Sequence, residues 1–492
     1  MALTINEFRL SYSNDIIYRK LLDDDNDYQY VINPGIILNN SSGYIWSKIE
    51  RDMELNELLN AVSIEFKCDV NDKLKEQVFS VLKYLIKKKC LIIENIKTYS
   101  AVSEDEIDKI FNTNLNIKCD YTKSNLDFDP IADIDLVVTK GCNFSCKHCF
   151  VSCSSELINN EAMSLEQWKM AIDKLCELGL TSVNITGGEP FTYKDVVPLM
   201  DYINSKNLNI FLLTNGFLLN EHIIEHISKF KKIKVQVSVD GASTNTHDLM
   251  RNTLNSFDRI CGNIKLLREY NVPVVMATTL STYNYEEVLN GKLINLAKEL
   301  NINVLGVTTT LVKVGRANDN WDICPEIEQS LDVIEYLKKE KEKEYPFKIS
   351  IGAPPALVEE TIENIEQSLP KCKRGINSCS LLSDGSVIVC TDFSEVKYEK
   401  YRLGNVLKED IKDIWKKAKH IRKERLNGAD NVKGVCSICK DKKRCGGSCR
   451  ADAYSTYKDI NAPYPFCQNL YEKGLFPKDK INAKSVYINF GE

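Results

Sequence analysis

The sequence predicts an α/β protein centred on a partial (β/α)6 parallel barrel, with a smaller unit on either side. Three observations predict this fold class. Strand-like runs alternate with helical patterns from Ile131 onward, which is typical of parallel βαβ units. Short strands and three helical patterns precede this region, and a Cys-rich stretch follows it. The length of 492 residues also suggests about three domains, at roughly 150 residues each.

Residues 1–95 are expected to form a winged-helix-like α+β domain. Strand-like runs at Tyr28–Asn33 and Ile36–Leu38 are joined through a Pro-Gly turn, and three helical patterns follow. The third pattern, Leu74 to Leu85, has apolar residues at helical spacing, and a last strand is expected at Leu91–Ile93. Residues 96–130 are polar and without a steady period, so we expect a linker.

The barrel is expected over residues 131–325, with its site at the C-terminal ends of the strands. Its six strand-like runs are Ile134–Val138, Val183–Thr186, Ile210–Leu213, Val235–Val239, Val272–Thr279 and Ile302–Val307. Residues 326–371 are expected to be a bridging helix and linker, and residues 471–492 a C-terminal tail. Residues 372–470 have little core-forming periodicity, so bound metal is the expected source of their stability.

Composition excludes several classes of protein. The 64 Lys and Arg nearly balance the 69 Asp and Glu, whereas a nucleic-acid protein with a broad basic surface has a pI above about 9. No apolar run approaches the ~20 residues that span a bilayer. The N-terminus lacks the apolar core of a signal peptide. We therefore expect a soluble, cytoplasmic protein with no nucleic-acid partner and no membrane association.

The 18 cysteines are the unusual feature of the composition. A long chain without an export signal does not need disulfides, so the surplus indicates metal-binding or catalytic thiols. With only 5 His, Cys2His2-type zinc sites are not favoured. The cysteines gather in three groups: Cys142, Cys146 and Cys149; Cys372, Cys379 and Cys390; and Cys436, Cys439, Cys445, Cys449 and Cys467. Others, such as Cys176, Cys261 and Cys153, are expected to pack as small hydrophobes.

The first group follows a buried strand in the pattern Cys-x3-Cys-x2-Cys. Three thiolates can hold three irons of a [4Fe–4S] cluster and leave the fourth iron open, although a zinc loop with a distant fourth ligand remains an alternative. Polar motifs follow the next strands: Gly187-Gly188-Glu189-Pro190, Thr214-Asn215-Gly216 and Ser238-Val239-Asp240-Gly241. They fall at successive strand ends, where a parallel barrel builds its site.

This arrangement closely resembles the radical S-adenosylmethionine (SAM) superfamily over about residues 131–320. The resemblance implies that Cys142, Cys146 and Cys149 hold a [4Fe–4S] cluster whose open iron binds SAM. It implies one-electron reduction of SAM to methionine and a hydrogen-abstracting 5′-deoxyadenosyl radical, with electrons from an external donor such as flavodoxin or ferredoxin. The residues that it implies for SAM binding are His148, Phe150, Gly187, Gly188, Glu189, Ser238, Asp240, Arg251 and Arg316. No residue is identified that handles protons of the substrate.

The C-terminal cysteines allow two zinc sites by spacing alone. The string as a whole resembles the SPASM domain of radical SAM enzymes, which carries auxiliary [4Fe–4S] clusters. That resemblance implies a first cluster on Cys372, Cys379, Cys390 and Cys449, and a second on Cys436, Cys439, Cys445 and Cys467. With the barrel cluster, this makes three. If Cys379 is only a packed thiol, the first auxiliary cluster has an open site.

Residues 1–95 resemble the RiPP recognition element, which binds the leader of a ribosomally made precursor peptide at a sheet edge. The three-part chain is thus similar to subtilosin-type peptide maturases. We expect hydrogen abstraction from a precursor peptide and formation of a Cys thioether crosslink. The alternatives are carbon–carbon crosslinking, epimerisation or other peptide or protein maturation, a tetrapyrrole enzyme, and a zinc-stabilised, non-catalytic binding adaptor.

Overall fold

The computed structural model describes residues 8–12, 18–22, 28–32, 36–38, 40–49, 53–87, 90–95, 100–101, 130–158, 163–358 and 372–482. The chain divides into two compact units. The first contains the N-terminal elements and the turn at residues 176–181, and the second contains the remainder from Asp133 onward. No helix in the described ranges is long and apolar enough to cross a membrane.

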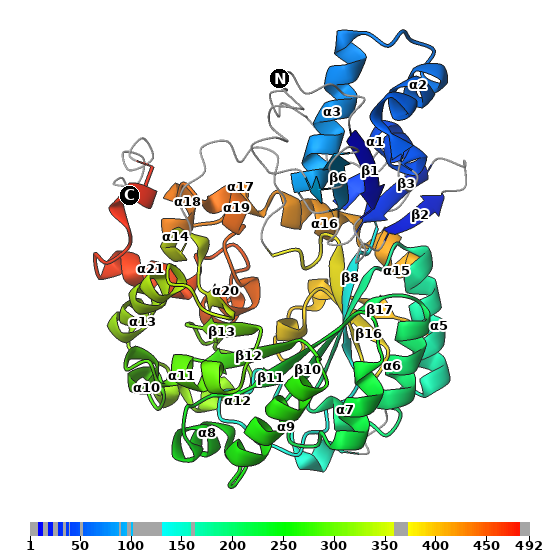
Figure 1. Cartoon of the computed structure of the whole chain (residues 1–492). Helices are drawn as coiled ribbons and strands as arrows, with labels where there is room; N and C mark the ends of the chain where they lie inside the picture. Colours follow the sequence, from blue (N-terminus) through cyan, green and yellow to red (C-terminus); the bar gives the residue numbers. More distant parts are fainter. Residues whose placement is uncertain are drawn as a thin grey trace. The chain divides into compact units, whose positions relative to one another are not determined.

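The N-terminal unit combines two antiparallel sheets with three helices, drawn in blue in Figure 1. One sheet has the order β2 (Tyr18–Leu22), β3 (Tyr28–Ile32), β4 (Ile36–Leu38). The other has the order β5 (Met53–Glu54), β1 (Phe8–Tyr12), β6 (Leu91–Asn95), β7 (Ser100–Ala101). The helices are α1 (Asn40–Lys48), α2 (Leu55–Glu65) and α3 (Asp72–Lys87).

The helices of this unit form because each presents an apolar stripe to one core. On α2 the buried residues are Leu55, Leu58, Leu59 and Val62, at the spacing of one helix face. They share a cluster with the buried Trp46 of α1. The expected strands at β3, β4 and β6 and the three expected helices are confirmed, while β1, β2, β5 and β7 are additional. Most of the expected linker, residues 96–130, lies outside the described residues.

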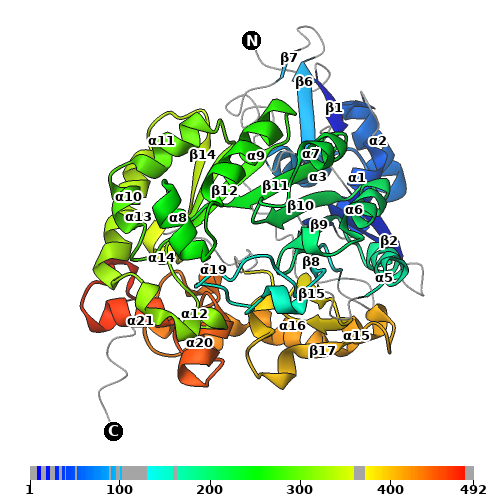
Figure 2. The same ribbon diagram turned by 90° about the horizontal axis from the view of Figure 1, so that it is seen from below.

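The second unit is built on a ten-stranded sheet in the order β14-β13-β12-β11-β10-β9-β8-β15-β16-β17. Strands β8 to β14 run parallel to their neighbours. Their bounds are β8 Asp133–Val137, β9 Ser182–Thr186, β10 Asn209–Thr214, β11 Ile233–Ser238, β12 Val274–Thr279, β13 Val304–Thr308 and β14 Lys348–Gly352. Figure 2 shows the strands as a curved inner layer with helices outside it. The six expected barrel strands are confirmed.

The helices that cover the barrel are amphipathic. On α5, Trp168, Ile172 and Leu175 are buried, and on α9 Ile260 and Ile264 are buried. The helices of this region are α5 Leu165–Glu177, α6 Val196–Ser205, α7 Glu221–Ser228, α8 Thr244–Arg251, α9 Phe257–Glu269, α10 Tyr285–Leu289, α11 Lys292–Glu299, α12 Arg316–Asp319, α13 Ile327–Lys341 and α14 Pro355–Val358. They place the C-terminal ends of the parallel strands at one edge of the sheet.

The sheet extends beyond the six expected strands at both ends. Strand β14 comes from the segment expected to be a helix and linker, and it pairs in parallel with β13. At the other end, β15 (Ser378–Leu382) pairs in parallel with β8 and continues to the antiparallel strands β16 (Ser386–Ile388) and β17 (Arg402–Asn405). The Cys-rich region therefore begins as part of the barrel sheet.

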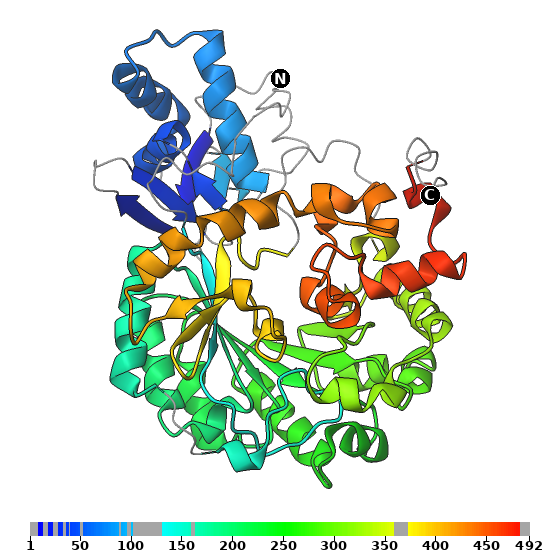
Figure 3. The ribbon, with the colours of Figure 1, turned by 180° about the vertical axis from the view of Figure 1, so that it is seen from behind.

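Short helices make up the rest of the C-terminal region, in orange and red in Figure 3. They are α15 Ile411–Lys417, α16 Lys419–Leu426, α17 Gly428–Asn431, α18 Val435–Ile438, α19 Lys442–Cys445, α20 Arg450–Tyr457 and α21 Pro465–Glu472. Side chains of this region hydrogen-bond to the barrel. Asp452 accepts from the backbone N–H of Lys313 at 3.1 Å, and the Tyr464 hydroxyl donates to Thr310 at 3.1 Å.

A buried carboxylate joins β15 to β8. Asp135 on β8 accepts hydrogen bonds from Arg374 at 2.7 Å and Asn184 at 2.9 Å through one oxygen. Its other oxygen accepts from Ser380 on β15 at 3.0 Å and from Thr391 at 3.1 Å. A buried carboxylate persists only when it is paired and hydrogen-bonded in this way. Figure 3 shows the C-terminal hairpin in yellow beside the cyan β8.

Replacing Asp135 with Ala is expected to lower the free energy of unfolding by about 3 kcal/mol, because a half-buried guanidinium and two buried hydroxyls each lose one acceptor. Glu166→Ala is the matched control, since it removes a carboxylate whose ion pair with Lys169 lies on the surface and is worth at most about 1 kcal/mol. The shift of the urea midpoint under anaerobic conditions measures both. Equal shifts for the two variants would contradict the role given to Asp135.

Candidate functional site

The loop that follows β8 carries Cys142, Cys146 and Cys149, and hydrogen bonds from distant parts of the barrel hold it. Arg316 donates to the carbonyl of Cys146 at 3.0 Å and to that of Cys153 at 2.6 Å. The N–H of Cys142 donates to the carbonyl of Ser154 at 3.0 Å. The three thiols are therefore fixed on a loop whose backbone groups are largely satisfied. Through these two bonds Arg316, which is also expected to contact SAM, positions the loop.

The three thiols differ in acidity. Burial raises the pKa of Cys142 to about 12 and also raises that of Cys146. The pKa of Cys149 is lowered to about 6, chiefly because the Cys153 thiol donates to its sulfur, with backbone N–H groups of Cys153 and Val151 adding to the effect. Since the thiolate is the form that binds metal, Cys149 is the thiol best prepared to do so. Cys153, expected to pack as a small hydrophobe, is buried, but its thiol also contacts the sulfur of Cys149.

Two glycines bring the end of β9 against this loop. A Cβ on Gly187 would lie 2.4 Å from the carbonyl oxygen of Thr139, and one on Gly188 would lie 2.1 Å from that of Gly141. Gly187 also has a φ of +146°, which favours glycine. The N–H of Gly188 donates to Thr139 at 2.9 Å, and that of Glu189 donates to Gly141 at 2.9 Å. Both positions therefore require glycine for close approach of the two chain segments.

Glu189 is a buried carboxylate at the strand ends. Its oxygens accept from the Thr214 hydroxyl at 2.7 Å and from the N–H of Asn215 at 2.7 Å. Burial nevertheless raises the pKa of Glu189 to about 7. The Asn215 amide in turn donates to Asn143 in the Cys loop at 2.8 Å. An oriented carboxylate in this position is suited to bind an ammonium group.

Asp240, after β11, is engaged with the protein itself. One oxygen forms an ion pair with Arg251 at 2.6 Å and lies 3.4 Å from the His148 ring, and the other accepts from the N–H of Thr279 at 2.7 Å. Arg251 also donates to the Cys146 sulfur at 3.7 Å. Burial lowers the pKa of His148 to about 4, so its ring is neutral at pH 7. These residues thus form one buried network against the Cys loop.

The remaining residues expected at this site lie around it. Ser238 ends β11 and is half-buried. Phe150 is 38% exposed, and its carbonyl is approached by Gly315, where a Cβ would lie 2.4 Å from the oxygen. Thr139 was not predicted as a site residue, but its hydroxyl accepts from the N–H of Gly141 in the Cys loop at 2.9 Å. A threonine at a strand end carries no distinguishing pattern, so spacing could not identify it.

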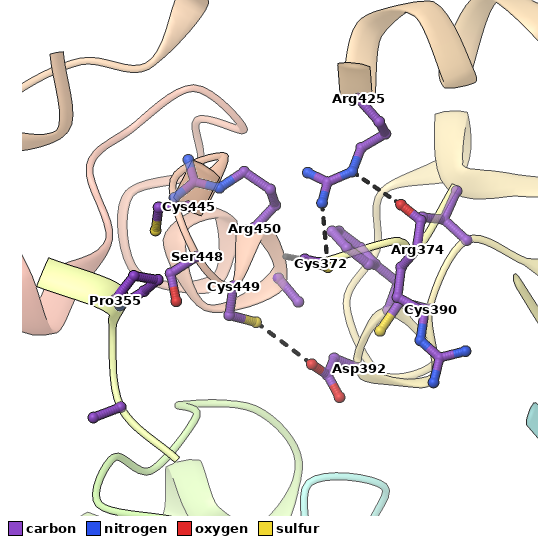
Figure 4. A pocket seen from close by; sticks show the side chains of 14 residues that line it. Pro355, Cys372, Arg374, Cys390, Asp392, Arg425, Cys445, Ser448, Cys449 and Arg450 are labelled. Carbon is purple, nitrogen blue, oxygen red and sulfur yellow. Dashed lines mark hydrogen bonds between the residues drawn. The ribbon is translucent and has the colours of Figure 1, made fainter. Parts of the chain in front are cut away.

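A cavity of about 300 Å³ in the C-terminal region gathers three of the expected cysteines, Cys372, Cys390 and Cys449 (Figure 4). Burial raises the pKa of Cys390 strongly, and the neighbouring Asp392, Cys372 and Cys449 raise it further. Arg425 donates to the Cys372 sulfur at 3.4 Å. The thiols thus face one another across a space flanked by a guanidinium. Cys379 is not among the residues that line this cavity.

The second expected group comes together completely. Cys436, Cys439, Cys445 and Cys467 line one small cavity. Burial raises the pKa of Cys467 strongly, and the other three thiols add to the effect. The N–H of Tyr464 donates to the Cys436 sulfur at 3.4 Å. Four thiols around one enclosed space form a closed ligand set.

The chemistry of these donor sets fits iron–sulfur clusters. All three sites present thiols, the soft ligands that such clusters use. Among the described residues, no three His, Cys, Asp or Glu side chains converge closely enough to hold a single metal ion. A [4Fe–4S] cluster spreads its ligands over four irons. The barrel loop, with three thiols, has the donor set that leaves one iron open.

Comparison with known proteins agrees with this geometry. The family description "Radical SAM superfamily" matches residues 136–290, and the SPASM "iron-sulfur cluster-binding domain" matches residues 372–445. An AdoMet-dependent heme synthase of Methanosarcina barkeri is 31% identical over 351 residues, which are 68% of this chain and 95% of that protein. The subtilosin biosynthesis protein AlbA of Bacillus subtilis is 33% identical over 152 residues, 31% of this chain and 34% of that protein.

A similar fold is found in the crystal structure of Streptococcus suis SuiB bound to S-adenosylmethionine. It has a TM-score of 0.62 at 16% identity and covers 93% of this chain and 100% of SuiB. The residues matched by the two family descriptions include the Cys loop, the glycine pair, Glu189 and most of the C-terminal cysteines. From its sequence, its parallel sheet and its cysteine sites, the chain belongs to the radical SAM superfamily and is an enzyme of that family with a SPASM domain.

Proposed function

We propose that this enzyme matures a ribosomally synthesised precursor peptide, binding the leader through residues 1–95 and forming a Cys thioether crosslink. The proteins named for subtilosin biosynthesis and sporulation killing factor maturation support this peptide assignment, each at 33% identity. SuiB, which shares the fold, has been crystallised with its precursor peptide SuiA. The SAM-dependent family sets aside the non-catalytic zinc adaptor.

The observation that carries this proposal is the N-terminal unit. The heme synthase match spans 95% of that protein but only 68% of this chain. The fold likeness to SuiB covers 93% of this chain, a share too large to leave out the N-terminal unit. This added α+β unit supports the proposal of leader binding, because its sheets offer edges to which a peptide strand can add.

The proposed leader site is an edge of the sheet β2-β3-β4. Within the described residues β2 and β4 each pair on one side only, so their other edges are available to a peptide strand. Main-chain hydrogen bonds of such an added strand give affinity with little dependence on leader sequence. Of the lysines on α3, Lys73 is exposed and Lys83 is only 6% exposed. Of these two lysines, Lys73 is therefore the one that an acidic leader could reach.

We assign the barrel residues the following roles. Cys142, Cys146 and Cys149 would hold the cluster to which SAM binds, and Glu189 would bind the SAM ammonium. The cluster and SAM, when bound, supply the hydrogen-abstracting radical. The closely packed Gly187–Gly188 backbone keeps the carboxylate of Glu189 beside the Cys loop. An external one-electron donor such as flavodoxin or ferredoxin would supply the electron.

Cys142→Ala is expected to abolish SAM cleavage and to remove about four irons per chain, because it deletes one ligand of the barrel cluster. Cys176→Ala is the matched control, a half-buried thiol on α5 far along the chain from the Cys loop. The formation of 5′-deoxyadenosine under dithionite, with iron analysis in parallel, measures both. Wild-type cleavage by the Cys142 variant would refute the assignment.

Anaerobic enzyme with SAM, a reductant and the precursor peptide encoded beside it is expected to yield a peptide lighter by two hydrogen atoms. Iodoacetamide should then fail to label the crosslinked cysteine. The same core peptide without its leader should react at least about tenfold more slowly, since it loses the β-augmentation that the N-terminal unit offers. A product that still labels with iodoacetamide would replace the thioether by a carbon–carbon crosslink or an epimer.

A second candidate is a tetrapyrrole enzyme, which the heme synthase match favours. Peptide maturation requires residues 1–95 to bind the leader, whereas conversion of a tetrapyrrole does not. Conversion of a tetrapyrrole at equal rates with and without a competing leader peptide would support the second candidate. No mass change in the precursor peptide beyond a control lacking SAM would remove the first.

A further inference from the structure

The first auxiliary cavity contains three of its four expected thiols, and the strand geometry explains where the fourth lies. Ser378 and Ser380 flank Cys379 on β15. Ser378 accepts from Arg374 at 2.7 Å, and Ser380 donates to Asp135 at 3.0 Å. Arg374, which lines the cavity, bonds both Ser378 and Asp135, so the two serines share one side of the strand with its guanidinium. Successive side chains of a strand point to opposite faces. The Cys379 thiol therefore points to the other face, where it is fully buried.

The cavity is also lined by a carboxylate, that of Asp392. Asp392 lies two residues after Cys390 and accepts from the Cys449 thiol at 3.4 Å. Figure 4 shows one of its carboxylate oxygens pointing toward the Cys449 sulfur. No ion pair of Asp392 with a lysine or arginine is found in the part of the chain that the structure describes. The carboxylate therefore faces thiols, and its charge is not neutralised by a salt bridge.

Two of the arginines that line the cavity already have other partners. Arg374 pairs with Asp135 at 2.7 Å and Asp133 at 3.6 Å. Arg425 donates to the backbone carbonyl of Arg374 at 3.1 Å and to the Cys372 sulfur. Their positive charge still favours anionic donors in this cavity, because guanidinium groups stay protonated. The cavity thus combines the three thiols expected there with that of Cys445, the Asp392 carboxylate and three arginines, Arg374, Arg425 and Arg450.

We infer that Asp392 is the fourth protein ligand of the first auxiliary cluster, in the place expected for Cys379. This rests on the proposed presence of that cluster. Iron accepts carboxylate oxygen as well as thiolate sulfur, and both donors must lose their protons to bind it. The proton that Cys449 shares with Asp392 would leave when the two groups bind different irons. Oxygen is the harder donor, so the iron bound by Asp392 is the most easily lost.

The test uses the full chain with Cys142, Cys146 and Cys149 all replaced by Ala, so that only auxiliary clusters remain. This background is expected to hold about eight irons after anaerobic reconstitution. Adding Cys372→Ala should lower the count to about four, which shows that the first auxiliary cluster exists in this cavity. An unchanged iron count would show that this cavity holds no cluster. That outcome differs from one in which the cluster is present but Asp392 is not its ligand.

Three further variants in this background test the ligand by iron analysis, Mössbauer and EPR spectroscopy. Asp392→Ala should convert one cluster to a three-iron form on mild oxidation, with its own EPR signal. In Asp392→Cys the same cluster should keep four irons and should not give the three-iron EPR signal. Cys379→Val, which fills the same buried space, should match the background. An unchanged EPR spectrum in Asp392→Ala, or loss of iron in Cys379→Val, would overturn the inference.

Discussion

The parallel pairing of β15 with β8, held by the buried Asp135, is the constraint on which the cluster sites depend. Asp135 satisfies donors from both the barrel and the C-terminal region, so the two share one sheet. The same contact fixes which face of β15 each side chain occupies. It also positions Arg374, whose chain neighbours bring Cys372 to the cavity. The barrel is therefore the scaffold that sets the register of the auxiliary site.

The cysteine sites share a second feature, a guanidinium beside a thiol. Arg251 donates to Cys146 at 3.7 Å, and Arg425 donates to Cys372 at 3.4 Å. Burying these cations is costly unless an anion compensates for the lost hydration. Asp240 compensates Arg251, whereas thiolates remain the available partners for Arg425 at its cavity. Bound clusters would thus contribute to folding free energy as well as to chemistry.

Much of this architecture could be predicted from the sequence, because periodicity and cysteine spacing report local structure. The six barrel strands and the Cys loop have strong patterns, as does the glycine pair before Glu189. Strand β14 was missed because the charged helix before it dominates its segment. Strand β15 was not predicted because its sequence, Ser-Cys-Ser, is polar. Its serines are buried because they hydrogen-bond to carboxylates that only the fold brings near. The ion pair of Asp240 with Arg251 is likewise a product of tertiary structure.

Spacing also could not show which face Cys379 occupies, because a ligand pattern counts residues but ignores the strand that contains them.

The central claim is that one enzyme has three cluster sites, and Mössbauer spectroscopy of the ⁵⁷Fe-reconstituted wild-type chain tests it most directly. We predict about twelve irons per chain, all in [4Fe–4S] clusters. A preparation that binds zinc at the C-terminal cysteines and only about four irons, all at the barrel loop, would contradict it.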